Sequence, residues 1–218
     1  MADRIIFITH KTEEFNHLDC VQIALDAGLK LIQLRLKSDV SNQEKVETIE
    51  KARVRCRVFG ASLTIDDDVR TAKRMHLSGV HLGKNDMPIA DARIILGENV
   101  LIGATANTLS DVLKASRNGA NYIGLGPFRH TTTKEKLEPI LGLKGYKNIM
   151  SSVASLGVKQ PIYAIGGIEL DDVESLMKIG FYGVAVSSAI LSAPNPVVAA
   201  RQFKRVVEQY KLSGSLEE

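Results

Sequence analysis

Residues Tyr122–Lys134 read YIGLGPFRHTTTK. A short apolar run gives way here to two glycines, a proline, three consecutive threonines and a lysine, which is typical of a strand that opens into a polar loop. Such a loop suits phosphate oxygens, because glycines let the backbone approach, hydroxyls donate hydrogen bonds and lysine offsets charge. By itself the stretch is equally compatible with a polar turn. Its place in a repeated pattern favours the functional interpretation.

The repeat consists of short β-rich runs that alternate with longer helical patterns along the chain. The expected strands are Arg4–Thr9, Leu29–Leu36, Ser62–Asp66, Gly79–Leu82, Leu101–Thr105, Tyr122–Gly126, Pro161–Ile165 and Gly183–Val186. The expected helices lie near Leu18–Ala27, Gln43–Phe59, Val69–Leu77, Ile89–Leu96, Leu109–Asn118, Leu143–Leu156, Leu170–Ile179 and Val197–Leu212. About eight βα units of this kind predict an α/β protein with the single-domain (β/α)8 TIM-barrel fold.

We expect the barrel to span residues 1–212 and residues 213–218 to form a disordered tail. A doubly wound open sheet is the alternative fold. That fold would usually carry a glycine-rich fingerprint after the first strand, where this chain has Thr9-His10-Lys11 instead.

Composition narrows the class of protein. Apolar residues make up 44% of the 218 residues, enough for a full core, and the net charge of +3 does not indicate a nucleic-acid surface. Cys20 and Cys56 fall in helical patterns and are expected to be buried thiols rather than a disulfide. Since no apolar run is long enough for a membrane span and the start reads as a first strand, we expect a cytoplasmic, soluble protein with no membrane partner.

Active sites of this fold lie at the carboxyl ends of the strands, and polar residues gather at those ends here. Gln33, Arg35 and Lys37 alternate with leucines, so the period of a strand places them on one face. Inward-facing cations require an anionic partner, and Arg35 can grip an oxyanion in a fork. The alternative is that this face points toward the helices, where unpaired cations would be costly.

Carboxylates concentrate at two neighbouring strand ends, at Asp66–Asp68 and at Asp86. Carboxylates alone would repel a diphosphate, but Mg²⁺ binds one or two carboxylates together with phosphate oxygens. We therefore interpret Asp67 and Asp86 as Mg²⁺ ligands. Asp68 is expected instead to cap the following helix, which is the alternative interpretation for the whole run.

A second anion site is predicted at the ends of the last two strands. Gly166-Gly167 and Ser187-Ser188 match the phosphate site that such barrels build from these loops and a short helix, here near Ser188–Leu191. Plain tight turns are the alternative. Two anion sites at one mouth suggest a two-substrate reaction with one diphosphate and one monophosphate, in which diphosphate is the leaving group.

At these residues the chain resembles the thiamine-phosphate synthase family, also called thiamine-phosphate pyrophosphorylase, over almost its whole length. The similar segments are QLRLK at Gln33–Lys37, DDDV at Asp66–Val69, GVHLGKND at Gly79–Asp86, GLGPFRHTTTK at Gly124–Lys134, AIGGI at Ala164–Ile168 and GVAVSSAI at Gly183–Ile190. The resemblance implies a Mg²⁺-dependent transferase of thiamine biosynthesis. Its substrates would be hydroxymethylpyrimidine diphosphate and thiazole monophosphate, joined by dissociative loss of diphosphate to give thiamine phosphate.

The resemblance also implies a role for each site residue. Diphosphate would be held by Arg35, Lys37 and Lys134, with Thr105 near the leaving group. Gln33 would line the pyrimidine side, and Asp66 and Lys84 would belong to the substrate-binding set. Thr131, Thr133, Gly167, Ser187 and Ser188 would bind the thiazole phosphate. His81 is expected to be a packed, hydrogen-bonded residue.

Several positions depart from the family pattern. The family usually has Asn at Asp66, Gln at Lys84, Ser at Thr105 and often His at Asn107. We hypothesise that Asp66 and Lys84 pair with each other.

Two other functions stay open at this point. A thiazole tautomerase-like isomerase is the first, but its catalytic His would occupy the slot of Pro127, and His130 lies three positions on. The second is a non-catalytic protein that binds a phosphate ligand.

Overall fold

In the computed structural model, which describes residues 3–36, 41–130 and 139–210, parallel strands close into a barrel in chain order. The strands are β1 (Ile5–Ile8), β2 (Leu31–Leu34), β3 (Ser62–Asp66), β4 (Gly79–Leu82), β5 (Leu101–Ala106), β6 (Tyr122–Leu125), β7 (Ile162–Ile165) and β8 (Gly183–Val186). β8 pairs with β1, as Phe7 opposite Val186 illustrates, so the sheet has no free edge. The predicted TIM barrel is confirmed.

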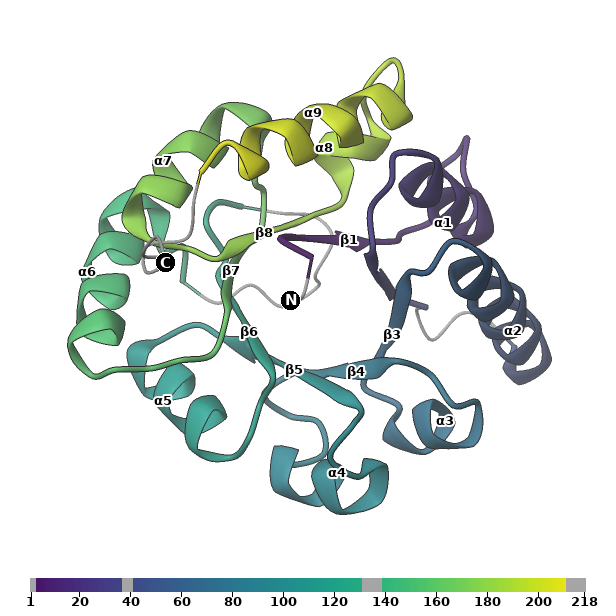
Figure 1. Ribbon diagram of the computed structural model, residues 1–218, viewed down its shortest axis with the longest axis horizontal. Coiled ribbons are helices and arrows are strands. Elements are labelled where there is room, and N and C mark those ends of the chain that lie inside the picture. The colour runs from purple at the N-terminus through teal and green to yellow at the C-terminus, as the bar shows by residue number, and fades with distance from the viewer. Residues whose placement is uncertain (1–2, 37–40, 131–138, 211–218) are drawn as a thin grey trace, which may run out of the picture.

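Helices form a ring outside the barrel, as the view along its axis shows (Figure 1). They are α1 (His17–Asp26), α2 (Asn42–Val58), α3 (Val69–Arg74), α4 (Ile89–Leu96), α5 (Leu109–Arg117), α6 (Gly142–Ser155), α7 (Val173–Ile179), α8 (Ser188–Leu191) and α9 (Pro196–Glu208), with a short 3-10 turn at Leu170–Asp172. Among the described helices, none has the length and apolar character that crossing a membrane requires.

Local sequence signals account for where the helices begin. The Asn16 side chain accepts hydrogen bonds from the backbone N–H groups of Leu18 and Asp19 at the start of α1, and the Asp19 carboxylate accepts one from the Asn16 N–H. Thr108 and Asp111 form the same reciprocal cap on α5. Such boxes satisfy N–H groups that have no partner inside the helix. Asp68 caps α3 through the Thr71 N–H at 2.9 Å, as the sequence predicted.

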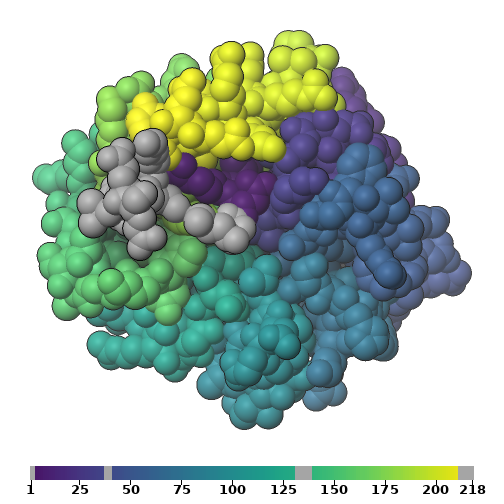
Figure 2. Space-filling model, in the orientation of Figure 1, coloured from purple at the N-terminus to yellow at the C-terminus, as the bar shows by residue number. Residues whose placement is uncertain are grey.

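Two apolar layers hold the fold together. The larger one lies between the strands and the helices and includes Phe7, Ile32 and Phe203, all at most 2% exposed. The smaller one fills the barrel interior with Ile6, Ile8, Leu31, Tyr122, Tyr163 and Ala185. Because the interior is filled mostly by apolar side chains, polar groups that can reach a ligand are expected at the carboxyl ends of the strands. In the space-filling view the later segments of the chain surround the purple N-terminal segment, which is visible near the centre (Figure 2).

Strand two is shorter than predicted. β2 ends at Leu34, so Arg35 lies just beyond the ladder rather than within a strand that runs to Leu36. Its backbone N–H donates to the Thr9 hydroxyl instead of to a strand neighbour, at 3.2 Å. Arg35 is therefore held at the mouth by a side chain from β1's carboxyl end.

Candidate active site

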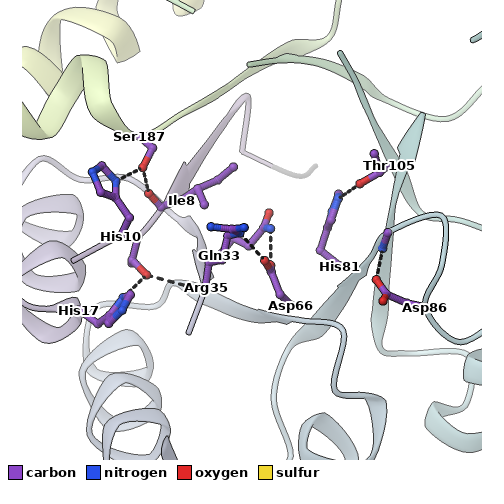
Figure 3. Close-up of polar contacts among 12 residues, drawn as sticks. Ile8, His10, His17, Gln33, Arg35, Asp66, His81, Asp86, Thr105 and Ser187 are labelled. Carbon is purple, nitrogen blue, oxygen red and sulfur yellow. Dashed lines mark hydrogen bonds and ion pairs between the residues drawn. The ribbon is translucent and has the colours of Figure 1, made fainter. Parts of the chain in front are cut away.

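The centre of the site is a carboxylate between two donors. Asp66, the last residue of β3, accepts a hydrogen bond from Gln33 Nε2 at 2.5 Å and lies 3.1 Å from Arg35 Nε (Figure 3). Gln33 is 4% exposed, and the side chains of Arg35 and Asp66 are 25% and 15% exposed. The predicted inward direction of Gln33 and Arg35 is consistent with this shared contact.

Arg35 retains donor capacity that no described residue uses. Its Nη1 atom is buried and has no hydrogen-bond partner in the described part of the chain. An unsatisfied buried donor on a charged group is costly, which points to an acceptor that a ligand supplies. A planar guanidinium in this state suits a phosphate oxygen.

Asp67 and Asp86 meet at the neighbouring strand ends. Asp67 has a positive φ of 64°, and its N–H donates to the His81 carbonyl at 2.9 Å. Asp86 accepts the Gly83 N–H at 2.5 Å, which closes the turn after β4. Burial, a hydrogen bond with the Asp86 carboxyl group and the charge of Asp66 raise the pKa of Asp67. A bound cation would reduce the electrostatic repulsion between carboxylates this close together.

The donor set fits Mg²⁺ as a partial site. In residues 3–36, 41–130 and 139–210, no group of three or more His, Cys, Asp or Glu side chains is arranged to hold a metal. Mg²⁺ characteristically uses one or two carboxylates and takes its remaining ligands from water and substrate phosphates. Asp67 and Asp86 match that pattern, whereas a closed zinc-type site would need more protein ligands.

His81 and Thr105 form a buried hydrogen-bonded pair across β4 and β5. His81 Nε2 lies 3.0 Å from Thr105 Oγ1, and His81 Nδ1 lies 3.3 Å from the Tyr122 hydroxyl. His81 is 6% exposed. The expectation of a packed, hydrogen-bonded histidine is confirmed.

The end of β1 supplies polar residues that the sequence interpretation missed. Thr9 Oγ1 lies 2.9 Å from His17 Nδ1, and His10 Nδ1 lies 2.7 Å from Ser187 Oγ. The Ser187 hydroxyl donates in turn to the Ile8 carbonyl at 2.5 Å (Figure 3). Thr9-His10 follows the first strand directly, so the rule that polar residues collect at strand ends was the available signal.

The loop after β6 is braced against the loop after β7. Gly166 and Gly167 have φ values of 94° and 68°, and a Cβ on Gly167 would come within 2.5 Å of Arg129 Cγ. Arg129 Nη1 donates to the Gly167 carbonyl at 2.7 Å, and its Nη2 reaches Asp172 at 2.8 Å. Gly167 thus lies next to Arg129, at the start of the loop after β6 that carries Thr131–Thr133 in the sequence and is called the threonine loop below. Ser188 begins the predicted short helix, α8, directly after Ser187.

The predicted pair between Asp66 and Lys84 is wrong. Asp66 faces inward and binds Arg35, whereas Lys84 Nζ reaches outward to Asp111 Oδ2 at 3.5 Å, on α5. The reason is geometric, because Lys84 sits in the turn beyond β4 while Asp66 still belongs to its strand. Lys37, Thr131, Thr133 and Lys134 lie outside the described residues.

Asn107 is a further polar residue that the sequence interpretation did not place in the site. Its Nδ2 donates to the Gly126 carbonyl at 2.5 Å, which ties the end of β5 to the start of the threonine loop. Its Oδ1 is buried without a partner in the described part of the chain. Asn107 directly follows a strand, as Thr9 and His10 do, so the rule that polar residues collect at strand ends could have identified it.

Comparison with known proteins agrees with this geometry. A family model described as thiamine monophosphate synthase matches residues 5–190. The chain is 45% identical to thiamine-phosphate synthase of Bacteroides fragilis, over 92% of this chain and 98% of that protein. It is 46% identical to thiamine-phosphate synthase of Flavobacterium psychrophilum, over 94% and 99% of the two chains.

A solved structure leads to the same family. Thiamine phosphate pyrophosphorylase from Pyrococcus furiosus superposes with a TM-score of 0.80 at 32% identity, covering 95% of this chain and 96% of that one. The family expected from the sequence segments is thereby confirmed. The chain belongs to the thiamine monophosphate synthase family.

Proposed function

We propose that the protein is the transferase that joins a hydroxymethylpyrimidine diphosphate to a thiazole monophosphate, giving thiamine phosphate and diphosphate. The carbon–oxygen bond to diphosphate breaks with its electron pair on the leaving oxygen. The thiazole nitrogen then supplies the lone pair for the new carbon–nitrogen bond. In a reaction of this kind the protein must stabilise the negative charge of the leaving group and align the two substrates. It does not need a strong base that removes a proton.

One observation carries this function most directly. Nη1 of Arg35 is buried and has no hydrogen-bond partner among the described residues, and Nε of the same side chain contacts Asp66, which directly precedes Asp67. The site thus places the Arg35 guanidinium beside the two carboxylates of Asp67 and Asp86. This arrangement suits a ligand that is anionic and also binds a metal ion. A diphosphate meets both conditions.

Mg²⁺ is part of the proposal. Asp67 and Asp86 would hold it, since their carboxyl groups already interact, and burial and this interaction raise the pKa of Asp67. The ion would offset the charge that develops on the departing diphosphate. Asp86 is pre-positioned for this task by the Gly83 N–H, which fixes one of its oxygens at 2.5 Å.

Thr105 is proposed to donate to the leaving group. If His81 Nε2–H donates to Thr105 Oγ1, the hydroxyl hydrogen of Thr105 is left for another acceptor. A fixed donor of this kind stabilises charge that forms as the bond breaks. Lys37 and Lys134 stay predicted diphosphate ligands, as the family resemblance implies.

The second substrate is assigned to the ends of β7 and β8. Gly167, Ser187 and Ser188, together with Thr131 and Thr133, remain the predicted thiazole phosphate ligands. The Ser187 hydroxyl already donates to the Ile8 carbonyl, so Ser187 would offer its backbone N–H to phosphate. The bracing of Arg129 against Gly167 and Asp172 supports a common site for the two loops.

A coupled assay tests the function. The purified chain is incubated with both substrates and Mg²⁺, and thiamine phosphate and released diphosphate are measured by chromatography. Equal amounts of the two products are expected. Isomerisation of a thiazole carboxylate phosphate without diphosphate release, or ligand binding without turnover, would contradict the proposal.

A further inference from the structure

Two side chains of the described residues, those of Gln33 and Arg35, donate to the carboxylate of Asp66. Gln33 Nε2 lies 2.5 Å from Oδ1, and Arg35 Nε lies 3.1 Å from Oδ2. The two oxygens are thus divided between two side chains that come from the same strand end. Asp66 controls the orientation of both.

The contact with Gln33 has only one chemical solution. An ionised carboxylate accepts hydrogen bonds and donates none, so the amide of Gln33 must turn its nitrogen toward Asp66. Its oxygen Oε1 is then on the far side of the amide, as Figure 3 shows. In the described part of the chain, Oε1 has no hydrogen-bond partner. Gln33 therefore offers the ligand an acceptor.

Asparagine at position 66 would not impose this choice. Its side chain carries an acceptor and a donor of similar size, so it could accept from Gln33 Nε2 or donate to Gln33 Oε1. The amide of Gln33 would then be free to present either group to a ligand. The negative charge at position 66 prevents Gln33 from turning its oxygen toward residue 66 and its nitrogen toward the ligand.

Arg35 is fixed by the same residue. Asp66 occupies Nε, and the Thr9 hydroxyl accepts the Arg35 backbone N–H at 3.2 Å. Nη1 is buried, has no hydrogen-bond partner in the described part of the chain, and remains as a donor for a ligand. This part of the site thus presents an acceptor, Gln33 Oε1, beside a cationic donor.

We infer that Asp66 is a positioning residue that makes the site select a diphosphate-bearing heteroaromatic ring with an amino group, rather than an oxo group, facing Gln33. The inference rests on the proposed function. An amino group donates to Gln33 Oε1, whereas an oxo group would place an acceptor against it. Discrimination comes from the unfavourable contact as much as from the favourable one.

The test compares two pyrimidine diphosphates that differ only in a 4-amino or a 4-oxo group. kcat/KM is measured for each at saturating thiazole phosphate, and the ratio is taken. We expect the wild type to prefer the amino compound by about 100-fold or more, and Asp66→Asn to lower this ratio by about 10-fold. Loosening of Arg35 in Asp66→Asn affects the two compounds alike and cancels in the ratio.

Two further variants separate positioning from general damage. Asp68→Asn removes a charge two residues away, at a position that caps α3 and pairs with Lys45 at 2.9 Å, and it should leave the ratio unchanged. Gln33→Leu removes the acceptor and should lower the ratio by itself. Adding Asp66→Asn to Gln33→Leu should lower it no further, because the two residues act as one unit.

An unchanged ratio in Asp66→Asn would overturn the inference. If the wild type forms no thiamine phosphate, the proposed function has failed, and the inference is then decided by binding. Dissociation constants of the 4-amino and 4-oxo pyrimidine alcohols are measured by calorimetry with Mg²⁺ and inorganic diphosphate present. Equal selectivity of wild type and Asp66→Asn, including no selectivity in either, would overturn it there too.

Discussion

The Nε2 atom of His81 lies 3.0 Å from the hydroxyl oxygen of Thr105. Nδ1 of the same ring faces the hydroxyl of Tyr122 at 3.3 Å, and burial raises the pKa of Tyr122, so that hydroxyl keeps its proton and can donate. With Tyr122 as the donor to Nδ1, a neutral imidazole would donate from Nε2 to Thr105. Thr105 then receives a hydrogen bond and has its own hydrogen available for the substrate.

Replacement of Thr105 should therefore reduce turnover. Thr105→Val keeps the shape and removes the hydroxyl, and we expect kcat to fall about 100-fold, the typical cost of losing one donor to a developing negative charge. Thr105→Ser keeps the hydroxyl and should stay within about 5-fold of the wild type. Steady-state kinetics on the three proteins provide the measurement. Equal losses in the Val and Ser variants would argue that Thr105 only packs against His81.

Removal of a carboxylate should abolish the response to Mg²⁺. A ligand that binds only the folded state raises the melting temperature, so Mg²⁺ with diphosphate should stabilise the wild type. Asp86→Asn keeps an oxygen for the Gly83 N–H but loses the charge, and we expect the Mg²⁺-dependent part of the shift to vanish.

Asp91→Asn is the matched control for this experiment. Asp91 is an exposed residue in the first turn of α4 and is not part of the site. Its variant should respond to Mg²⁺ and diphosphate as the wild type does. A full Mg²⁺ response in Asp86→Asn, measured by differential scanning fluorimetry, would remove Asp86 from the metal site.

Arg129 should influence the thiazole substrate selectively. Arg129→Ala breaks the contacts with Gly167 and Asp172 at the base of the threonine loop, so we expect KM for thiazole phosphate to rise about 10-fold. KM for the pyrimidine diphosphate should change far less. The melting temperature should fall only slightly, because the Arg129 side chain is 44% exposed and exposed ion pairs add little stability.

Lys178→Ala serves as the control for Arg129. It breaks another exposed ion pair, with Glu174 on α7, that lies away from the loop. Neither KM should change. A similar rise of both KM values in Arg129→Ala would show that the residue acts on the whole fold and not on one substrate.

The buried thiols should make stability fall at alkaline pH. Cys20 and Cys56 are at most 1% exposed, and burial raises the pKa of each thiol to about 11. The unfolded chain loses these protons from about pH 8.5, so the folded state loses stability as pH rises through this window toward 11. At pH 9.5 the loss should be about 1.4 kcal/mol per thiol.

Urea unfolding at pH 7.5 and 9.5 measures this effect. The decrease in the free energy of unfolding should be much smaller in Cys20→Ala/Cys56→Ala than in the wild type, whatever the absolute stability of the variant. Working below pH 10 limits the contribution of tyrosine ionisation. Equal decreases in the two proteins would show that other groups cause the pH dependence.

The fold and the family were predictable because they depend on patterns that repeat or are local. The alternation of strands and helices predicted the barrel, and Asp68 before α3 predicted a cap. The rule that chemistry lies at strand ends also brought Gln33 and Asp66 into one region. Their contact at 2.5 Å follows from β2 and β3 being adjacent in the barrel.

Partner choice could not be predicted in the same way. The side chains of His10 and Ser187 are 177 positions apart and meet only because β8 closes the barrel on β1. The prediction for Lys84 was wrong because it considered only the charge of the residue. The direction of the side chain is set by the turn after β4, and it brings the Lys84 ammonium group to Asp111. The order of the strands was enough to predict which strand ends lie near each other. The contacts between individual side chains also depend on the residue at which each strand ends.

The left-handed backbone of Asp67 limits which residues natural or laboratory selection can place there. At a φ of 64°, glycine, asparagine and aspartate fit with little strain, whereas alanine and branched residues do not. A saturation library at this position, sorted only for soluble expression, should be enriched in glycine and asparagine over alanine. Alanine scanning would therefore overstate the catalytic weight of the carboxylate, and asparagine is the informative replacement.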